Sequence, residues 1–75
     1  MREKELVEYI AKGLVEAPEE VSVREVRGGK VTVLELKVGR KDMGRVIGKD
    51  GRVANAIRTL LRVAAQDSRV VLEID

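Results

Sequence analysis

The first apolar pattern along the chain has helical spacing. Within residues 2–17, hydrophobic side chains recur three and four positions apart, which is the spacing of an amphipathic helix with one buried face. The members of this stripe are Leu6, Val7, Ile10, Ala11, Leu14 and Val15. Pro18 disfavours helical backbone angles at the residue before it. The helix is therefore predicted to end near residue 16.

Residues 21–38 change to the alternation that is typical of β-strands, with Val, Thr and Leu frequent. Gly28 and Gly29 stand in the middle, where a tight hairpin turn needs glycine. The second strand has one apolar face, formed by Leu34, Leu36 and Val38. In the first strand Val26 breaks the alternation, which predicts a bulge or an early strand end at this position.

The second half of the chain returns to helical spacing and ends in one more strand. Residues 40–48 predict a short helix, residues 51–66 a longer helix, and residues 69–75 a strand. The side chains expected to face inward are Met43, Val46 and Ile47 in the short helix, Val53, Ile57, Leu60 and Ala64 in the long helix, and Val70, Leu72 and Ile74 in the strand. Those expected to face solvent from the long helix are Arg52, Asn55, Thr59 and Arg62.

The predicted order is helix, strand, strand, helix, helix, strand, and it indicates one fold class. Three strands can form a sheet that the three helices cover on one face, which is a two-layer α+β sandwich. A chain of 75 residues has the size of one small domain, so residues 1–75 are predicted to form a single domain. Such a domain has a modest core, and association with a second chain is a common source of added stability.

Composition excludes several kinds of site. The chain has no Cys and no His, which removes disulfides, thiolate metal sites and the usual zinc-binding spacings. We expect no metal and no cofactor. The longest uninterrupted apolar runs have three residues, whereas a membrane span needs about 20. Because the sequence also lacks the apolar stretch of a signal peptide, it is predicted to be a soluble cytoplasmic protein.

The net charge of +2 is unevenly distributed along the chain. Residues 40–62 carry seven basic and two acidic side chains, which leaves a local net charge of +5, whereas residues 1–39 and 63–75 are slightly acidic. The basic excess surrounds the stretch "VIGKDG" at residues 46–51. It is either an ordinary solvated helix face or a surface for an anionic partner, and the charge alone leaves both interpretations open.

The same stretch contains Gly48, Lys49, Asp50 and Gly51 between two predicted helices. Gly51 begins the second helix, whose first backbone N–H groups are unpaired and carry partial positive charge. Such a helix start binds anions, and the Lys49 ammonium can donate to a phosphate oxygen. Asp50 opposes anion binding by its charge but can cap the free N–H groups. The alternative interpretation is a corner between helices that only needs glycines.

The residues of this stretch resemble the KH domain, a module that binds single-stranded nucleic acid. The segment "VIGKDGRVANAIRTLL" matches the family's pattern of Ile-Gly-x-x-Gly followed by a helix with small and aliphatic residues. The predicted element order resembles the type II arrangement of this family, and the likeness covers essentially the whole chain. With "LVEYIAKGLVEAPEEV" near its start, the sequence is similar to the small bacterial RNA-binding proteins of the KhpA type.

The resemblance implies a role for each residue of the motif. Members of the family clamp about four nucleotides with the Gly-x-x-Gly loop. The residues implied to bind RNA are Gly48, Lys49, Asp50 and Gly51 in the loop, Arg52 and Asn55 on the following helix, Arg40, Lys41 and Arg45 on a basic rim, and Val46 and Ile47 beneath the bases. Val46 and Ile47 have a second interpretation as plain core residues. Arg58 and Arg62 are expected on a solvated helix face.

The resemblance also implies partners. Proteins of this type associate with themselves and with a larger RNA-binding protein that contains a KH domain. We therefore expect single-stranded RNA as the ligand and a homodimer or heterodimer as the working form. The expected contact surface is the exposed part of the last two helices. The implied process is post-transcriptional regulation or RNA chaperoning.

Other function classes fit the sequence poorly. Tyr9 is the only aromatic residue, which excludes the aromatic stacking platforms of other RNA-binding folds. The interval from Gly44 to Gly48 is one residue too short for the phosphate-binding loop of nucleotidases. Without His or Cys, no catalytic triad can be assembled, so an enzyme is not expected. The open alternative is a protein-interaction or dimerisation scaffold with little intrinsic RNA binding.

Overall fold

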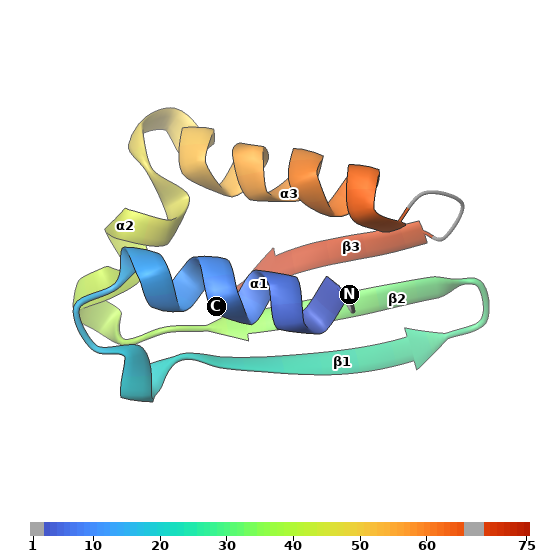
Figure 1. Ribbon diagram of the computed structural model, residues 1–75, viewed down its shortest axis with the longest axis horizontal. Coiled ribbons are helices and arrows are strands. Elements are labelled where there is room, and N and C mark those ends of the chain that lie inside the picture. Colours follow the sequence, from blue (N-terminus) through green and yellow to red (C-terminus); the bar gives the residue numbers. More distant parts are fainter. Residues whose placement is uncertain (1–2, 66–68) are drawn as a thin grey trace.

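Three strands form one sheet, and three α-helices lie on one of its faces (Figure 1). The computed structural model describes residues 3–65 and 69–75. The helices are α1 (Glu3–Leu14), α2 (Met43–Ile47) and α3 (Arg52–Ala65), and the strands are β1 (Ser22–Gly28), β2 (Val31–Lys37) and β3 (Arg69–Ile74). Short 3₁₀ turns at Pro18–Glu20, Arg40–Asp42 and Lys49–Gly51 precede β1, α2 and α3. The predicted order of elements and the two-layer α+β architecture are confirmed.

The sheet has the strand order β1-β2-β3 and is mixed. β1 and β2 are antiparallel, and Gly29 and Lys30 join them in a two-residue turn. Gly29 has a φ of 60° in the first turn position, where a type II′ hairpin turn favours glycine. β2 and β3 are parallel, so the chain must cross over between them, and α2 and α3 lie in that crossover.

Strand β1 is continuous, so the predicted bulge or early strand end at Val26 is wrong. Each residue from Ser22 to Gly28 has one partner on β2, and Val26 lies opposite Val33. Val26 points to the outer face of the sheet, where it is 39% exposed. The alternation breaks in the sequence because this outer face carries a row of valines that the register brings side by side. The row consists of Val26, Val33 and Val71.

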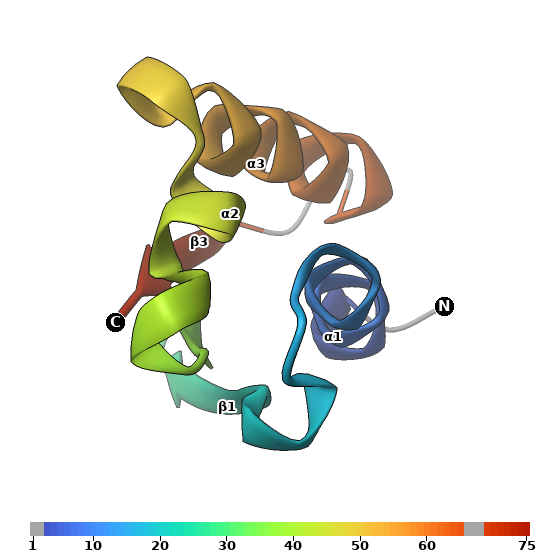
Figure 2. The same cartoon turned by 90° about the vertical axis from the view of Figure 1, so that its left-hand side faces the viewer.

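Helices α1 and α3 cover the inner face of the sheet, with α2 at one end (Figure 2). Aliphatic side chains from these elements fill the space between the two layers. The buried residues include Val7, Ala11, Leu34, Leu36, Val46, Ile57, Leu61 and Leu72. The predicted inward side of β3 is confirmed, since Val70 and Ile74 also pack against this core. Within residues 3–65 and 69–75, no helix has the length and apolar character needed to cross a membrane.

The inward face of α3 differs from the predicted one. The residues that it buries are Ala54, Ile57, Leu61 and Ala65. Leu60 is 51% exposed, and Ala64 is exposed as well, so their predicted inward position is wrong. The helix has apolar residues on two adjacent sides, and spacing alone does not show which side meets the sheet. The predicted polar face is confirmed, because Arg52, Asn55, Thr59 and Arg62 are all exposed.

Candidate functional site

The Gly48–Gly51 loop joins α2 to α3 as a tight turn. The Gly48 N–H donates to the Gly44 carbonyl over 2.9 Å and closes α2, and the Gly51 N–H donates to the Gly48 carbonyl over 3.1 Å. Lys49 and Asp50 lie between the two glycines, and both side chains are exposed. The four residues form a protruding corner at the start of α3, which is 14 residues long (Figure 1).

The two glycines of the loop are needed for different reasons. Both have a φ of 76°, in a region that residues other than glycine rarely adopt. A Cβ atom at Gly48 would also lie 2.4 Å from Cγ2 of Val53. A Cβ atom at Gly51 would have 3.9 Å to Nδ2 of Asn55, which is ordinary contact. Gly48 is therefore restricted by conformation and by space, and Gly51 by conformation alone.

The loop presents free backbone donors at the start of α3. Among the hydrogen bonds of the described residues, none uses the N–H groups of Lys49 and Asp50. Asp50 has φ 57° and ψ 25°, which is the left-handed region, and Lys49 before it does not have a positive φ. Successive N–H groups in a turn of this kind point toward the same side and make a concavity for an anion.

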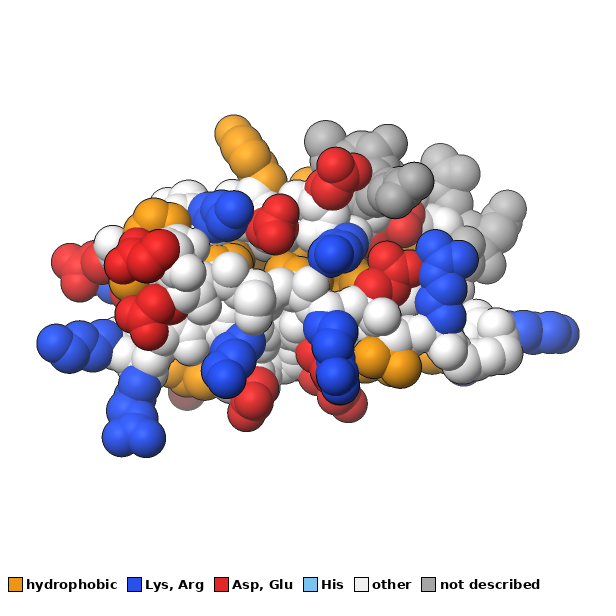
Figure 3. Space-filling view, turned by 90° about the horizontal axis from the view of Figure 1, so that it is seen from below, with side chains coloured by type: hydrophobic (Ala, Val, Ile, Leu, Met, Phe, Trp, Pro, Cys, Tyr) orange, Lys and Arg blue, Asp and Glu red, His pale blue; other side chains and the backbone are white. Residues whose placement is uncertain are grey.

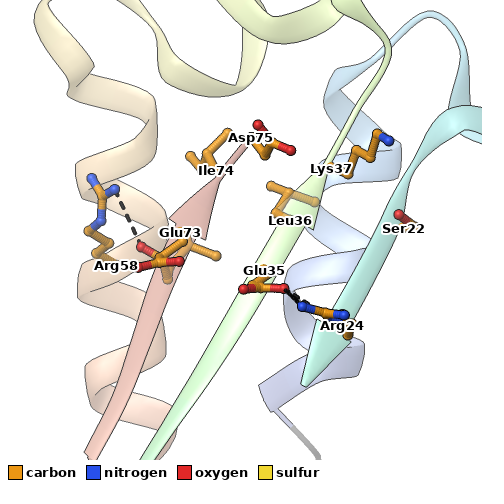
Figure 4. A pocket seen from close by; sticks show the side chains of 10 residues that line it. Ser22, Arg24, Glu35, Leu36, Lys37, Arg58, Glu73, Ile74 and Asp75 are labelled. Carbon is orange, nitrogen blue, oxygen red and sulfur yellow. Dashed lines mark hydrogen bonds and ion pairs between the residues drawn. The ribbon is translucent and has the colours of Figure 1, made fainter. Parts of the chain in front are cut away.

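An open groove runs between α3 and the free edge of β3, and we call it the α3–β3 groove. A hollow of about 180 Å³ in it is lined by Arg58, Leu61 and Arg62 of α3 and by Val70, Val71 and Leu72 of β3. A larger hollow of about 850 Å³ adjoins it on the outer face of the sheet, where Arg58 is joined by Arg24, Glu35, Lys37 and Glu73 (Figure 4). β3 pairs with β2 on one side only, so its other edge leaves backbone groups without strand partners.

Arg58 connects the two walls of the α3–β3 groove. Its guanidinium donates to Oδ1 of Asn55 over 3.1 Å and to the carbonyl of Leu72 over 3.5 Å (Figure 4). The interpretation of Arg58 as part of a solvated helix face missed this position, whereas Arg62 is exposed as expected and also lines the groove. Their spacing is the signal that could have found them, because Asn55, Arg58 and Arg62 follow one another along the side of α3 that leads away from the loop.

The residues predicted to bind RNA differ in how exposed they are in the structure. Those exposed on the loop and on the first turn of α3 are Lys49, Asp50, Arg52 and Asn55. Val46 is completely buried, in agreement with its interpretation as a core residue. Ile47 is 37% exposed next to Gly48, so the expectation that it faces inward is wrong. Ile47 thus offers an apolar surface beside the loop.

The predicted basic rim is divided between two environments. Arg40 and Lys41 are exposed in the 3₁₀ turn before α2. Arg45 lies among acidic groups, since its guanidinium is 3.4 Å from Oε2 of Glu16 and 3.4 Å from Oδ1 of Asp42. These two carboxylates compete with any phosphate for Arg45 and direct it toward the segment that follows α1.

Basic and acidic side chains balance on the outer face of the sheet. Basic and acidic side chains are also interleaved on the neighbouring side of the molecule, which Figure 3 shows from below. Arg24 on β1 and Glu35 on β2 form an ion pair across the two strands, with 2.7 Å between nitrogen and oxygen. The charged residues at outward positions are Arg24, Lys37, Arg69, Glu35, Glu73 and Asp75. The basic excess of residues 40–62 therefore comes from the turn before α2, the loop and α3, and not from the sheet.

Comparison with known proteins places the chain in a family. The sequence model described as KhpA/KhpB, KH domain matches residues 4–74. The chain is 58% identical over 73 residues to the RNA-binding protein KhpA of Clostridium perfringens, which covers 95% of this chain and 97% of that protein. It is 53% identical over 72 residues to the RNA-binding protein KhpA of Caldanaerobacter subterraneus, which covers 93% of this chain and 96% of that protein.

Solved structures share the fold at lower identity. A crystal structure of Era in complex with MgGDPNP and nucleotides 1506–1542 of 16S ribosomal RNA matches with a TM-score of 0.68 and 22% identity. The match covers 96% of this chain and 28% of the Era chain, so it concerns one part of that protein. The resemblance seen in the Gly-x-x-Gly segment thus extends over nearly the whole sequence, and the chain belongs to the KhpA/KhpB family of KH domains.

Proposed function

We propose that this chain binds single-stranded RNA, with the Gly48–Gly51 loop holding the phosphate backbone and the α3–β3 groove holding the bases. One observation carries the proposal: the free N–H groups of Lys49 and Asp50 stand at the start of α3, beside the exposed Lys49 ammonium. Donors of this kind at a helix N-terminus favour a phosphate group. The naming of the relatives as RNA-binding proteins supports the same function.

A single extended strand fits this arrangement better than a duplex. The α3–β3 groove offers a hollow of about 180 Å³, which suits unstacked bases, and a Gly-x-x-Gly loop clamps about four nucleotides. The proposed contacts are Gly48, Lys49, Asp50 and Gly51 in the loop, Arg52, Asn55, Arg58 and Arg62 along α3, Ile47 beneath a base, and Arg40 and Lys41 farther out. Val46 contributes only by packing in the core beneath them.

The proposed role is non-catalytic, in the bacterial cytoplasm, in post-transcriptional regulation or as an RNA chaperone. The sequence has no His or Cys from which a nucleophile and a base could be assembled. The relatives with 58% and 53% identity are bacterial proteins whose names refer to RNA binding alone.

We further propose that the chain works as a homodimer or beside a larger KH-containing RNA-binding protein. α3 exposes Leu60 (51%) and Val63 (70%), and the neighbouring α1 exposes Tyr9 (79%). Large apolar side chains gathered on a surface are typical of interaction sites. Arg58 and Arg62 line the groove on the other flank of α3. A second chain on the apolar side would leave the groove open and would place two RNA sites in one assembly, which raises the affinity for an RNA that reaches both.

The second candidate function is a protein-interaction scaffold with little RNA binding of its own. The exposed Leu60 and Val63 favour it, because they need a protein surface and not RNA to become buried. The two candidates differ in what the loop must do. RNA binding requires Lys49 in the loop, whereas a scaffold function is indifferent to it.

Titration of a short fluorescent single-stranded RNA separates the two candidates. Lys49→Asp places a second carboxylate in the loop, and the control Lys30→Asp makes the same charge change in the hairpin turn at the opposite end of the molecule (Figure 1). Both side chains are exposed, so both variants should fold. We expect Lys30→Asp to bind like the wild type and Lys49→Asp to bind at least about tenfold more weakly. Equal affinity of all three proteins contradicts the loop assignment, and no binding by the wild type favours the scaffold.

Salt dependence tests the phosphate contacts in the same assay. Single-stranded RNA loses affinity with salt at a log–log slope of about −0.7 per phosphate neutralised, so two to four contacts give a slope of roughly −1.5 to −3. Duplex RNA of the same length should compete poorly. A slope near zero, or a preference for the duplex, speaks against a clamp on a single strand.

A further inference from the structure

Asp42 stands out among the described residues as a charged side chain that is almost completely buried, at 2% exposure. Its two carboxylate oxygens accept the backbone N–H groups of Glu16, over 3.0 Å, and of Ala17, over 3.1 Å. Asp42 also occupies the residue before α2, yet its side chain caps no N–H group of that helix. Its hydrogen-bonding capacity is used by a segment 25 and 26 residues earlier in the chain.

These two bonds tie the start of α2 to the end of α1. α1 ends at Leu14, and Glu16 and Ala17 lead from it toward β1. Hydrogen bonds to an ionised carboxylate are stronger than those between neutral groups, and a buried carboxylate without partners is costly. Arg45 of α2 lies 3.4 Å from Oδ1 of Asp42 and offsets its charge. The contact is therefore a firm link between two elements that are distant in sequence.

The link bears on the Gly48–Gly51 loop because α2 has only five residues. A helix this short is not stable by itself, so its position depends on what it contacts. It lies against α3 and α1, its Val46 is buried in the core, and Asp42 stands at its start. The loop follows the end of α2 directly. Building on the proposed RNA binding, we infer that Asp42 is a positioning residue that holds α2, and with it the free N–H groups of the loop, in the geometry that receives a phosphate.

Asp42→Asn tests this role because it keeps the shape of the side chain. The amide has one acceptor oxygen and places an NH₂ donor where a backbone N–H already points. Val23→Ala, in the core part of β1, is the control for a general loss of stability. Both variants are measured under conditions in which circular dichroism shows them fully folded. If Asp42→Asn does not fold, it is made in a Gly13→Ala background, because α1 has open space at Gly13 and alanine stabilises a helix.

The two readouts are RNA affinity and hydrogen exchange of the bonded amides around the loop, which are those of Gly48, Gly51 and Arg52. For Asp42→Asn we expect about tenfold weaker binding, as if a tenth of the molecules had the competent loop, together with faster exchange of these amides. Val23→Ala should bind RNA like the wild type. The exchange readout needs no RNA, so it tests positioning even if the wild type binds none. An equal loss of affinity in both variants, or unchanged exchange in Asp42→Asn, overturns the inference.

Discussion

A Cβ atom at Gly48 would stand 2.4 Å from Cγ2 and 2.8 Å from the backbone nitrogen of Val53, the second residue of α3. A side chain of Val53 could rotate, but its backbone nitrogen cannot move without shifting α3. The close approach of Gly48 to Val53 is therefore one of the contacts that hold the loop against the start of the helix. The free N–H groups of the loop depend on it for their position.

The first prediction compares the two glycines of the loop. Gly48→Ala combines an unfavourable positive φ with steric overlap, so we expect it to lower the free energy of unfolding by about 2–5 kcal/mol. Gly51→Ala has the same φ but would make only an ordinary contact with Asn55, and the expected loss is about 1–2 kcal/mol. Urea unfolding of both variants measures the difference. Equal losses would mean that Val53 yields to a side chain at position 48.

The second prediction concerns Asp50, whose exposed carboxylate belongs to the loop that is proposed to bind phosphate. Asn adopts the left-handed conformation about as readily as Asp. We expect Asp50→Asn to change the free energy of unfolding by at most about 1 kcal/mol, which is the value of a carboxylate near a helix start. RNA affinity should rise about two- to fivefold, since a repulsion between exposed charges is removed. Weaker RNA binding by Asp50→Asn would show that the carboxylate itself contacts the RNA.

The third prediction concerns the wall of the α3–β3 groove. Arg58→Met keeps an apolar stem and removes the donors, so we expect about tenfold weaker RNA binding from the loss of charge-assisted hydrogen bonds. The matched control is Arg24→Met on the outer face of the sheet, which breaks an exposed ion pair with Glu35 and does not touch the hollow of about 180 Å³ that Arg58 lines. Arg24→Met should bind RNA within about twofold of the wild type. If both variants lose affinity equally, net charge and not the groove controls binding.

The fourth prediction concerns association of two chains through α3. Leu60→Gln and Val63→Gln together remove exposed apolar surface without changing charge, and each should alter the free energy of unfolding by less than about 0.5 kcal/mol. Sedimentation at tens of micromolar, with and without RNA carrying two spaced sites, should show association of the wild type and its loss in the double variant.

Val71→Gln is the control for this fourth experiment, since Val71 is an exposed valine on the outer face of the sheet. It should associate like the wild type. A wild type that stays monomeric in both conditions rules out the homodimer and leaves only pairing with a different protein. Loss of association in Val71→Gln, and not in the double variant of Leu60 and Val63, would show that the contact surface lies on the sheet.

Sequence patterns predicted the element order because each element has its own hydrophobic period. They also located the loop, since glycines at positions 48 and 51 interrupt two helical patterns. The rotation of α3 was not predictable from spacing. Leu60 and Leu61 are equally apolar, and only contact with the sheet decides that Leu61 is buried and Leu60 exposed. The prediction at Val26 was wrong for a related reason. An apolar residue on the exposed outer face of a sheet interrupts the alternation of the sequence in the same way as a bulge does.

The extent of the candidate site was less predictable than its centre. Arg58 becomes a groove residue only because the parallel pairing of β2 and β3 brings the edge of β3 beside α3. Arg45 looks like a rim residue in sequence, but Glu16 and Asp42 reach it from other elements. The positions of Arg58 and Arg45 both depend on contacts between residues far apart in the chain, and a local sequence pattern does not predict such contacts.

The parallel pairing of β2 and β3 also determines the point during synthesis at which the chain can form the α3–β3 groove. The loop and α3 lie within the crossover between these strands, so the ribosome makes every loop residue before it makes β3. Until β3 has left the ribosome and paired with β2, the groove lacks one wall and α3 lacks part of its support. A nascent chain should therefore not bind RNA in the groove until β3 has paired with β2. Unfinished copies would then not compete with finished protein for the same transcripts.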